Sequence, residues 1–138
     1  MTWSTLEIEY EGFPLLLRRP NYENIWQYKE RFSQLVSVEH QLTTVSGSGL
    51  PGSNYNKALE DFDSYMCDKF INGKKGIILL IETFAGKRNY YYYTELNYNV
   101  NSQFKEVKEQ FLVNLTAWHK LDLDWGFLDK YPIVVFEK

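Results

Sequence analysis

The segment from Gly76 to Leu96 constrains the fold of this 138-residue chain most strongly. It reads GIILLIETFAGKRNYYYYTEL, an apolar run, a glycine-containing turn and four consecutive tyrosines, which together predict a β-hairpin. Successive side chains of a strand point to opposite faces, so the stretches Ile77 to Ile81 and Tyr90 to Tyr93 give the sheet two apolar faces. A single layer of helices covers only one of them. The other face needs a partner, a ligand or a further segment of the chain.

The register of this hairpin predicts which residues share each face. If Ala85 to Arg88 form the connection, Thr83 lies opposite Tyr90 and Glu82 opposite Tyr91. The helices are then expected to pack on Ile77, Leu79, Ile81, Tyr90 and Tyr92. The second face carries Ile78, Leu80, Tyr91 and Tyr93, which we predict to be an interface unless the opening hairpin covers it.

The rest of the chain alternates between strand and helix patterns. Alternating apolar residues around Glu11-Gly12 predict an opening hairpin that ends at Pro20, and residues 21–31 indicate a short helical or irregular piece. A third strand is expected within residues 32–44. Two amphipathic helices and a last strand follow. The first helix has Ser53 or Asn54 as its cap and one apolar stripe, formed by Tyr55, Leu59, Phe62, Met66 and Phe70. The stripe of the second helix is formed by Phe104, Val107, Phe111 and Leu115, and the last strand runs from Ile133 to Phe136.

After the opening hairpin, the predicted order of elements is βαββαβ. This order is typical of an α+β, ferredoxin-like two-layer sandwich in which two helices pack on one face of the sheet. At 138 residues the chain suits a single domain, 1–138, with an extra N-terminal β-hairpin. Phe62 and Phe111, each central in its helical stripe, are predicted to anchor the two helices in the core.

Composition excludes several classes of function. The net charge of −3, with Lys and Arg scattered along the chain, argues against nucleic acid as a partner. The N-terminus lacks the basic start and apolar core of a secretion signal, and no window reaches the ~18 apolar residues of a membrane span. We therefore expect a cytoplasmic protein with no membrane partner. Cys67 is the only cysteine, so an internal disulfide is impossible.

No motif for catalysis or for a cofactor stands out. His119 with Asp122 and Asp124 offers three metal-ligand types within six residues, but the two carboxylates equally suit the caps of a turn before Trp125. His40 lies within a predicted strand and Cys67 on a helix, where both are expected to be packing residues. The glycine-containing loop from Ser46 to Gly52 lacks the Lys-Ser/Thr ending of a phosphate loop. We therefore predict no catalytic residue, no metal and no cofactor.

Several short motifs resemble a known family. They are Gly49-Leu50-Pro51 before the first helix, Gly86 to Tyr93 with its four tyrosines, Asp124-Trp125, and Tyr131-Pro132. Together they resemble a bacterial domain-of-unknown-function family, the one numbered six hundred and ninety-five, over nearly the whole chain. That family is similar in turn to regulator of ribonuclease E activity B, a ferredoxin-like protein that acts by binding a nuclease. The resemblance implies the βαββαβ order and a binding role, and it supplies no catalytic residues.

Three functions follow as hypotheses. The first is a non-enzymatic, regulatory domain that binds a protein, or a second copy of itself, through an aromatic sheet face or edge. The second is a small enzyme or ligand binder with a pocket between the loop Ser46 to Gly52 and the segment Trp118 to Trp125. Its lining would include Trp118, His119, Asp124 and Trp125. The third is an inhibitor of the toxin-immunity type, suggested by small size and acidity.

Overall fold

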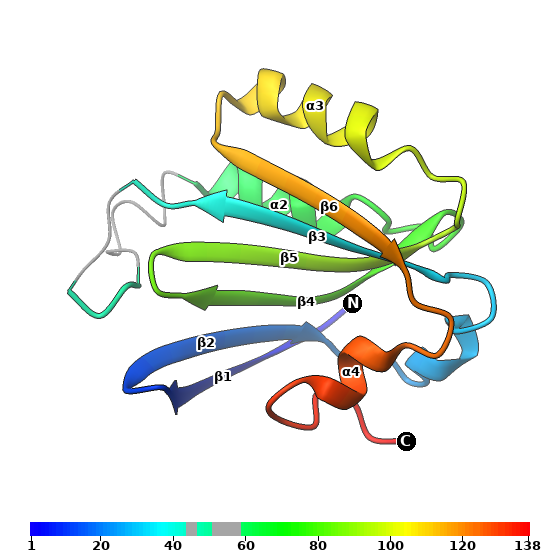
Figure 1. Ribbon diagram of the computed structural model, residues 1–138, viewed down its shortest axis with the longest axis horizontal. Helices are drawn as coiled ribbons and strands as arrows, with labels where there is room; N and C mark the ends of the chain where they lie inside the picture. The colour runs from blue at the N-terminus through cyan, green and yellow to red at the C-terminus, as the bar shows by residue number, and fades with distance from the viewer. Residues whose placement is uncertain (44–46, 51–58) are drawn as a thin grey trace.

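A computed structural model describes residues 1–43, 47–50 and 59–138. The predicted cap residues Ser53 and Asn54, and Tyr55 of the first helical stripe, lie outside these ranges. The fold is α+β: six strands form one antiparallel sheet in the order β1-β2-β4-β5-β3-β6 (Figure 1). The elements are β1 (Trp3–Tyr10), β2 (Phe13–Pro20), the 3-10 helix η1 (Ile25–Tyr28), β3 (Gln34–Gln41), α2 (Glu60–Asp68), β4 (Gly76–Phe84), β5 (Lys87–Thr94), α3 (Val100–Phe111), β6 (Leu115–Leu121) and α4 (Gly126–Lys130).

Both hairpins turn through two residues that adopt positive φ. In the first, Glu11 has φ 51° and Gly12 has φ 84°, and in the second Ala85 has φ 52° and Gly86 has φ 82°. Two successive residues at positive φ define the turn whose twist matches that of paired strands. The opening hairpin is therefore as predicted, while the connection of the central hairpin is two residues long and not four.

The shorter turn changes the register of the central hairpin. Thr83 pairs with Arg88 and Ile81 with Tyr90, so the predicted pairing of Thr83 with Tyr90 is wrong. A bulge between Ile78 and Leu80 then shifts the register once more. Because an extra residue reverses the side-chain alternation beyond it, Ile78 lies on the helix face, and Ile77 and Leu79 lie on the opposite face. Ile81, Tyr90 and Tyr92 remain under the helices as predicted.

Two prolines explain why the opening hairpin joins the sheet through only a short ladder. Asn21 N–H donates to Thr2 O, so Asn21 and every second residue before it direct their backbone N–H and C=O groups toward β1. The residues between them direct these groups toward β4; they are Pro14, Leu16, Arg18 and Pro20. Pro14 and Pro20 have no N–H to donate. Accordingly β2 pairs with β4 only from Leu16 to Arg18. The hairpin extends the sheet sideways and does not fold over its second face.

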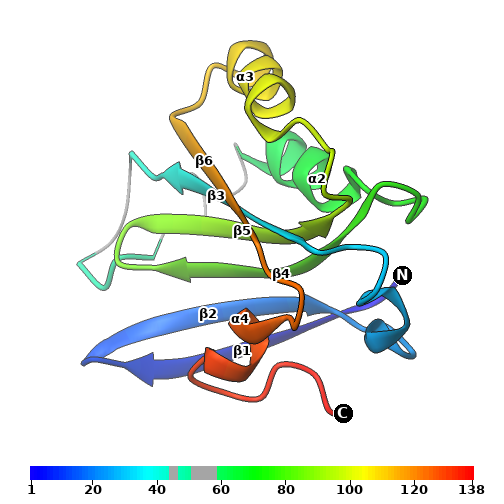
Figure 2. The same ribbon diagram turned by 45° about the vertical axis from the view of Figure 1, so that its right-hand side comes forward.

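Both faces of the sheet are covered, so the two-layer expectation is incomplete. Helices α2 and α3 pack on one face, over Tyr90 and Tyr92, and η1, α4 and the C-terminal segment pack on the other (Figures 1 and 2). Segment 133–136, predicted as the last strand, is an irregular part of this second cover. The sixth strand is β6, whose first residue, Leu115, the helical spacing predicts to lie in a helix. The helix ends earlier because Leu112 adopts a left-handed conformation with φ 53°.

The two predicted core anchors differ in burial. Phe62 is buried and meets the ring of Tyr90 edge to face, at a centroid distance of 6.0 Å. Phe111 is half-buried at the end of α3, where its ring contacts Phe62 and Tyr65. Phe62 is therefore a core residue as predicted, whereas Phe111 covers the edge of the same cluster.

Candidate functional site

The predicted interface residues of the sheet lie inside the molecule. Leu80 and Tyr93 are buried on the second face, and Tyr91 is half-buried there, with its ring 4.6 Å from the ring of Phe127. Ile78 is buried on the helix face because of the bulge. The chain's own segments thus occupy the surface that these four side chains were expected to offer to a partner.

Trp125 is the centre of this cover. Its side chain is 0% exposed, and its indole ring stacks on Tyr93 with the planes 3° apart and the centroids at 4.3 Å. The indole Nε1–H donates to Phe32 O at 2.7 Å, and Tyr93 OH donates to the carboxylate of Asp122 at 2.7 Å. Asp122 also accepts the backbone N–H groups of Gly126 and Phe127, so its role as a cap is confirmed. These three bonds hold the pKa of Asp122 below its usual value, although burial opposes its ionisation.

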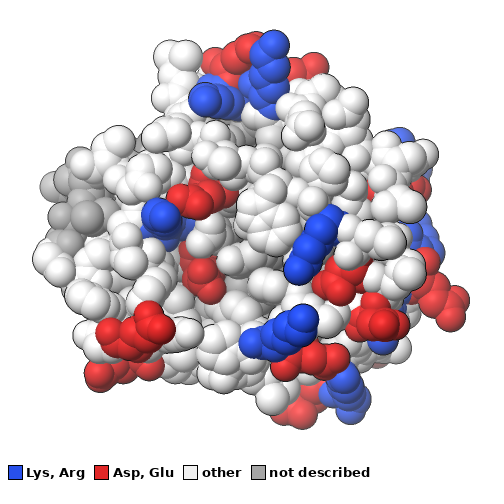
Figure 3. Space-filling view, viewed as in Figure 1, with Lys and Arg blue, Asp and Glu red and all other residues white. Residues whose placement is uncertain are grey.

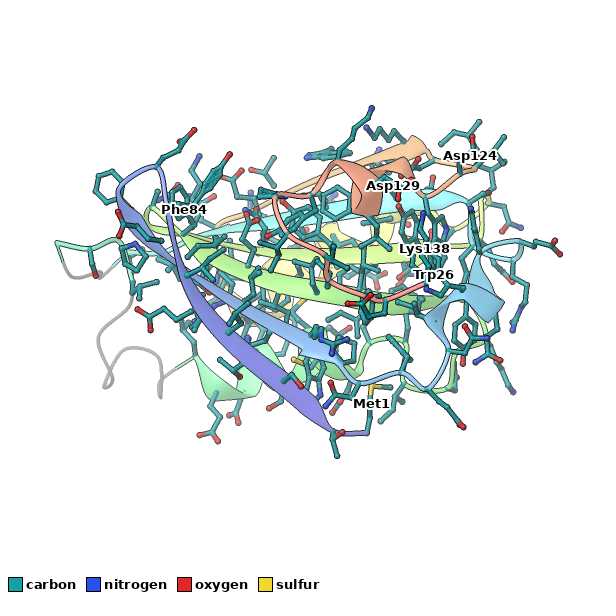
Figure 4. The ribbon with its side chains drawn as sticks, turned by 90° about the horizontal axis from the view of Figure 1, so that it is seen from below. Met1, Trp26, Phe84, Asp124, Asp129 and Lys138 are labelled. Atoms are coloured by element: carbon teal, nitrogen blue, oxygen red, sulfur yellow. The ribbon has the colours of Figure 1, made fainter. Side chains whose placement is uncertain are left out.

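The predicted pocket residues do not converge. Trp118, His119 and Asp124 are exposed, whereas Trp125 is buried among aromatic rings. Gly49 accepts a hydrogen bond from Gly86 N–H at the hairpin turn, while Trp125 lies beside Phe32, before the start of β3. The eight residues of β3, about 25 Å of strand, separate these two places. Figure 4 shows the same separation, with Phe84 and Asp124 at opposite ends of the molecule.

A partly buried polar network that sequence patterns do not reveal joins α2 to the sheet. Asp63 accepts two hydrogen bonds from the guanidinium of Arg18, at 2.6 and 2.8 Å, and a third from Tyr90 OH at 2.7 Å. Arg88 lies 3.6 Å from the same carboxylate and donates to Thr83. Burial opposes ionisation of Asp63, but Arg18, Tyr90 and Arg88 together hold its pKa below the usual value. The network is a structural clamp between the opening hairpin, the sheet and α2.

The two groups next to this clamp are poor candidates for catalysis. Burial, followed by the charge of Asp63, raises the pKa of the Cys67 thiol to about 12, so the nucleophilic thiolate is suppressed. His40 is buried against the ring of Phe62, and its Nδ1 has no hydrogen-bond partner within the part of the chain that the structure describes. Burial and, next, the charge of Arg88 lower the pKa of His40 and keep it neutral. Both residues are packed side chains, as the sequence predicts.

One cavity lies against the C-terminal segment. It measures about 460 Å³, and residues 131–138 form much of its lining. The Lys138 ammonium closes one side by pairing with Asp129 at 2.9 Å and lies above the ring of Trp26 (Figure 4). No group of three or more His, Cys, Asp or Glu side chains in the described ranges converges to hold a metal ion.

Among the described residues, strand β6 is an edge of the sheet and pairs with another strand on one side only. Gln41 N–H donates to Asn114 O and Asp122 N–H donates to Ser33 O, one bond at each end of the ladder between β3 and β6. Backbone groups of an antiparallel strand alternate in direction, so Thr116, Trp118 and Lys120 pair inward with β3. By the same alternation Leu115, Ala117, His119 and Leu121 direct their N–H and C=O groups outward, away from the sheet.

The side chains around this edge are unusually apolar for an unprotected strand. Trp118 is 44% exposed, Leu121 55% and Leu123, just after the strand, 63%. The Lys120 ammonium lies 5.9 Å from the centre of the Trp118 ring. From Leu115 to Leu121 the strand has no carboxylate and one lysine.

The opposite edge, β1, has a different chemistry. There the outward backbone groups belong to Trp3, Thr5, Glu7 and Glu9, because Asn21 N–H bonds to Thr2 O. Glu7 and Glu9 place two exposed carboxylates along that edge, a common protection against strand pairing. On the face of the molecule shown in Figure 3, basic and acidic side chains are interspersed. The β6 edge is therefore distinguished by its apolar side chains and not by charge.

Comparison with known proteins adds no family. The chain matches no protein-family model, no curated protein and no solved structure. The resemblance to the family numbered six hundred and ninety-five accordingly stays a prediction. Within the described ranges, none of the helices is long and apolar enough to cross a membrane.

Proposed function

We propose that this chain is a binding domain that takes up an extended polypeptide segment along the open edge of β6. A segment that adds to a sheet edge gains main-chain hydrogen bonds, and the side chains on either side of the edge provide selectivity. The observation that carries the proposal is the run of outward backbone groups at Ala117, His119 and Leu121, beside exposed Trp118 and Leu121. It refines the hypothesis of an aromatic sheet face or edge by choosing the edge.

The burial of the second face supports the choice of the sheet edge. Leu80, Tyr93 and Trp125 are buried against each other, so uncovering them for a partner would first break the stacked rings and the Asp122 cap. Pairing at β6 requires no such opening. We also assign the region from β3 to β6 to the ferredoxin-like class, supported by its βαββαβ order, its strand order β4-β5-β3-β6 and two helices on one face.

Photo-crosslinking in the cells that make the protein tests the proposal. A photoreactive amino acid at Leu121 lies beside the open edge and is expected to capture a polypeptide. The same amino acid at Leu112, which is 90% exposed at the end of α3, serves as the matched control for exposure. We expect adducts from position 121 and few from position 112.

A proline substitution shows whether captured polypeptides use the backbone of β6. His119 directs its N–H outward, so His119→Pro removes an edge donor while the bonds between β6 and β3 persist. Thr5→Pro does the same at the β1 edge and is the matched control. Loss of the adducts in His119→Pro but not in Thr5→Pro supports strand addition. If position 121 gives no adducts, or if the adducts persist in His119→Pro, strand addition at β6 is contradicted.

A further inference from the structure

We propose that the segment that pairs with β6 is the β6 strand of a second copy, antiparallel about a two-fold axis through His119. The inference rests on the proposed function and names its partner. An antiparallel pair joins the outward groups of one strand to those of the other. With the axis at His119, the outward residues Ala117, His119 and Leu121 meet Leu121, His119 and Ala117 of the partner subunit. Every outward group of this stretch thereby gains a counterpart.

The side chains of β6 are complementary to themselves in this register. Trp118 lies opposite Lys120 of the partner subunit, and the reciprocal contact repeats the pair across the axis. These are positions without mutual hydrogen bonds, where facing Cα atoms approach to about 4.5 Å and side chains interact most closely. Within one chain the Lys120 ammonium already lies 5.9 Å from the centre of the Trp118 ring. The dimer therefore forms a row of alternating lysines and tryptophans in which no lysine directly faces a lysine.

At the β1 edge the corresponding pairing is opposed by charge. A two-fold axis at Glu7, which like His119 is the third outward residue of its strand, would place Glu7 directly opposite Glu7 of the partner subunit. Like charges directly opposite each other destabilise a strand pair. Pairing β1 of one copy with β6 of another is head-to-tail and leaves free edges at both ends, whereas the two-fold β6 pair closes. Of the two edges, β6 is the one built for a closed dimer.

Sedimentation of the purified chain tests the second copy as the partner. A concentration series up to the solubility limit is expected to show a monomer–dimer equilibrium for the wild type. His119→Pro is expected to shift it to monomer, because two outward donors are lost per dimer, and Thr5→Pro is expected to leave it unchanged. A wild-type monomer at every concentration, or a dimer that His119→Pro leaves intact, would overturn the inference.

Disulfide trapping tests the register. Facing residues of a hydrogen-bonded antiparallel pair have Cα atoms about 5.5 Å apart, within the range that a disulfide spans. In a Cys67→Ser background, His119→Cys is expected to form a covalent dimer under mild oxidation, and Thr5→Cys, at the other edge, is expected to stay monomeric. Equal trapping at both positions would overturn the symmetric register.

The photo-crosslinking at Leu121 separates this inference from the proposed function. Adducts with the mass of two chains support both. Adducts with other polypeptides only, from a chain that sediments as a monomer, overturn the second copy and leave strand addition at β6 supported. The absence of any adduct from a monomeric chain overturns both.

Discussion

The two faces of the sheet are buried to a similar depth by opposite means. On one face, α2 and α3 place Phe62, Met66, Phe104 and Val107 over Tyr90 and Tyr92 at regular helical spacing. On the other, η1, the five-residue α4 and an irregular C-terminal segment bring Ile25, Trp125, Leu128 and Phe136 over Leu80 and Tyr93. Regular helices are therefore not required to close an aromatic sheet face. Single large residues on short segments also close such a face when their polar atoms are hydrogen-bonded. The indole N–H of Trp125, for example, donates to Phe32 O.

The largest effect is expected from removing the centre of the irregular cover. Trp125→Ala deletes a fully buried ring, its stack on Tyr93 and its bond to Phe32, and is expected to lower the free energy of unfolding by about 3–5 kcal/mol. Chemical denaturation measures the change. Trp118→Ala, at the exposed edge, is the control, with an expected loss below about 1 kcal/mol. A loss for Trp125→Ala as small as that of the control would show that this cover contributes little to stability.

On the helix face, two phenylalanines in contact are expected to differ. Phe62→Ala creates a cavity among His40, Tyr90 and Phe111 and is expected to cost about 3–5 kcal/mol. Phe111→Ala is expected to cost clearly less, because that ring is partly exposed to water. Thermal unfolding of both variants measures the order. Equal losses would indicate that Phe111 is as central to this core as Phe62.

A smaller effect is expected from the clamp beneath α2. Asp63→Asn keeps the side-chain shape but removes the charge that pairs with Arg18, and is expected to destabilise the fold by about 1.5–3 kcal/mol. The loss should shrink in acid, because the depressed pKa of Asp63 means that its stabilisation is present above the ordinary value of 3.8 and disappears as the carboxylate is protonated. Denaturation at neutral and at strongly acidic pH tests both statements. If Asp63→Asn destabilises the fold equally at both pH values, the ion pair does not account for the loss.

The smallest effect is a pH dependence from His40. Its pKa is lowered in the folded state, so as pH falls below the ordinary 6.5 the unfolded chain binds a proton that the folded chain excludes. Stability should therefore fall toward acid pH, with a slope from this residue of at most about 1.4 kcal/mol per pH unit. In His40→Leu the slope just below pH 6.5 should be flatter than in wild type. Identical slopes would assign the acid sensitivity to other groups.

Much of the helix face was predictable because it depends on local periodicity. Alternation placed Tyr90 and Tyr92 on the side opposite Tyr91 and Tyr93, and the helical stripe identified Phe62 as a core residue. The same periodicity failed at Leu79, because a bulge depends on the partner strand and has no signature in an apolar run. It failed again at Leu112, where the helix ends on a left-handed leucine in place of the usual glycine.

The features that bear on function lie beyond local patterns. The Asp63 clamp joins residues 45 positions apart in the chain, at Arg18 and Asp63, and the indole of Trp125 reaches back 93 positions to Phe32. The open edge arises because β6 pairs on one side only, which depends on strand order and not on its own residues. The sequence predicts Trp118 and His119 as the lining of a pocket. The backbone groups of these two residues point to opposite sides of β6, which follows only from the pairing of β6 with β3.

The position of Trp125 in the chain has a consequence for synthesis. Chains emerge from the ribosome N-terminus first, and all strands from β1 to β5 and both long helices precede α4 and the C-terminal segment. Until Trp125 and Phe136 have been made, only η1 and the residues beside it are available to cover Tyr93 and Leu80. Such transiently exposed apolar surface is the kind that chaperones bind. A chain that ends shortly before Trp125 should therefore be recognised by chaperones more strongly than the 138-residue chain, once both have left the ribosome.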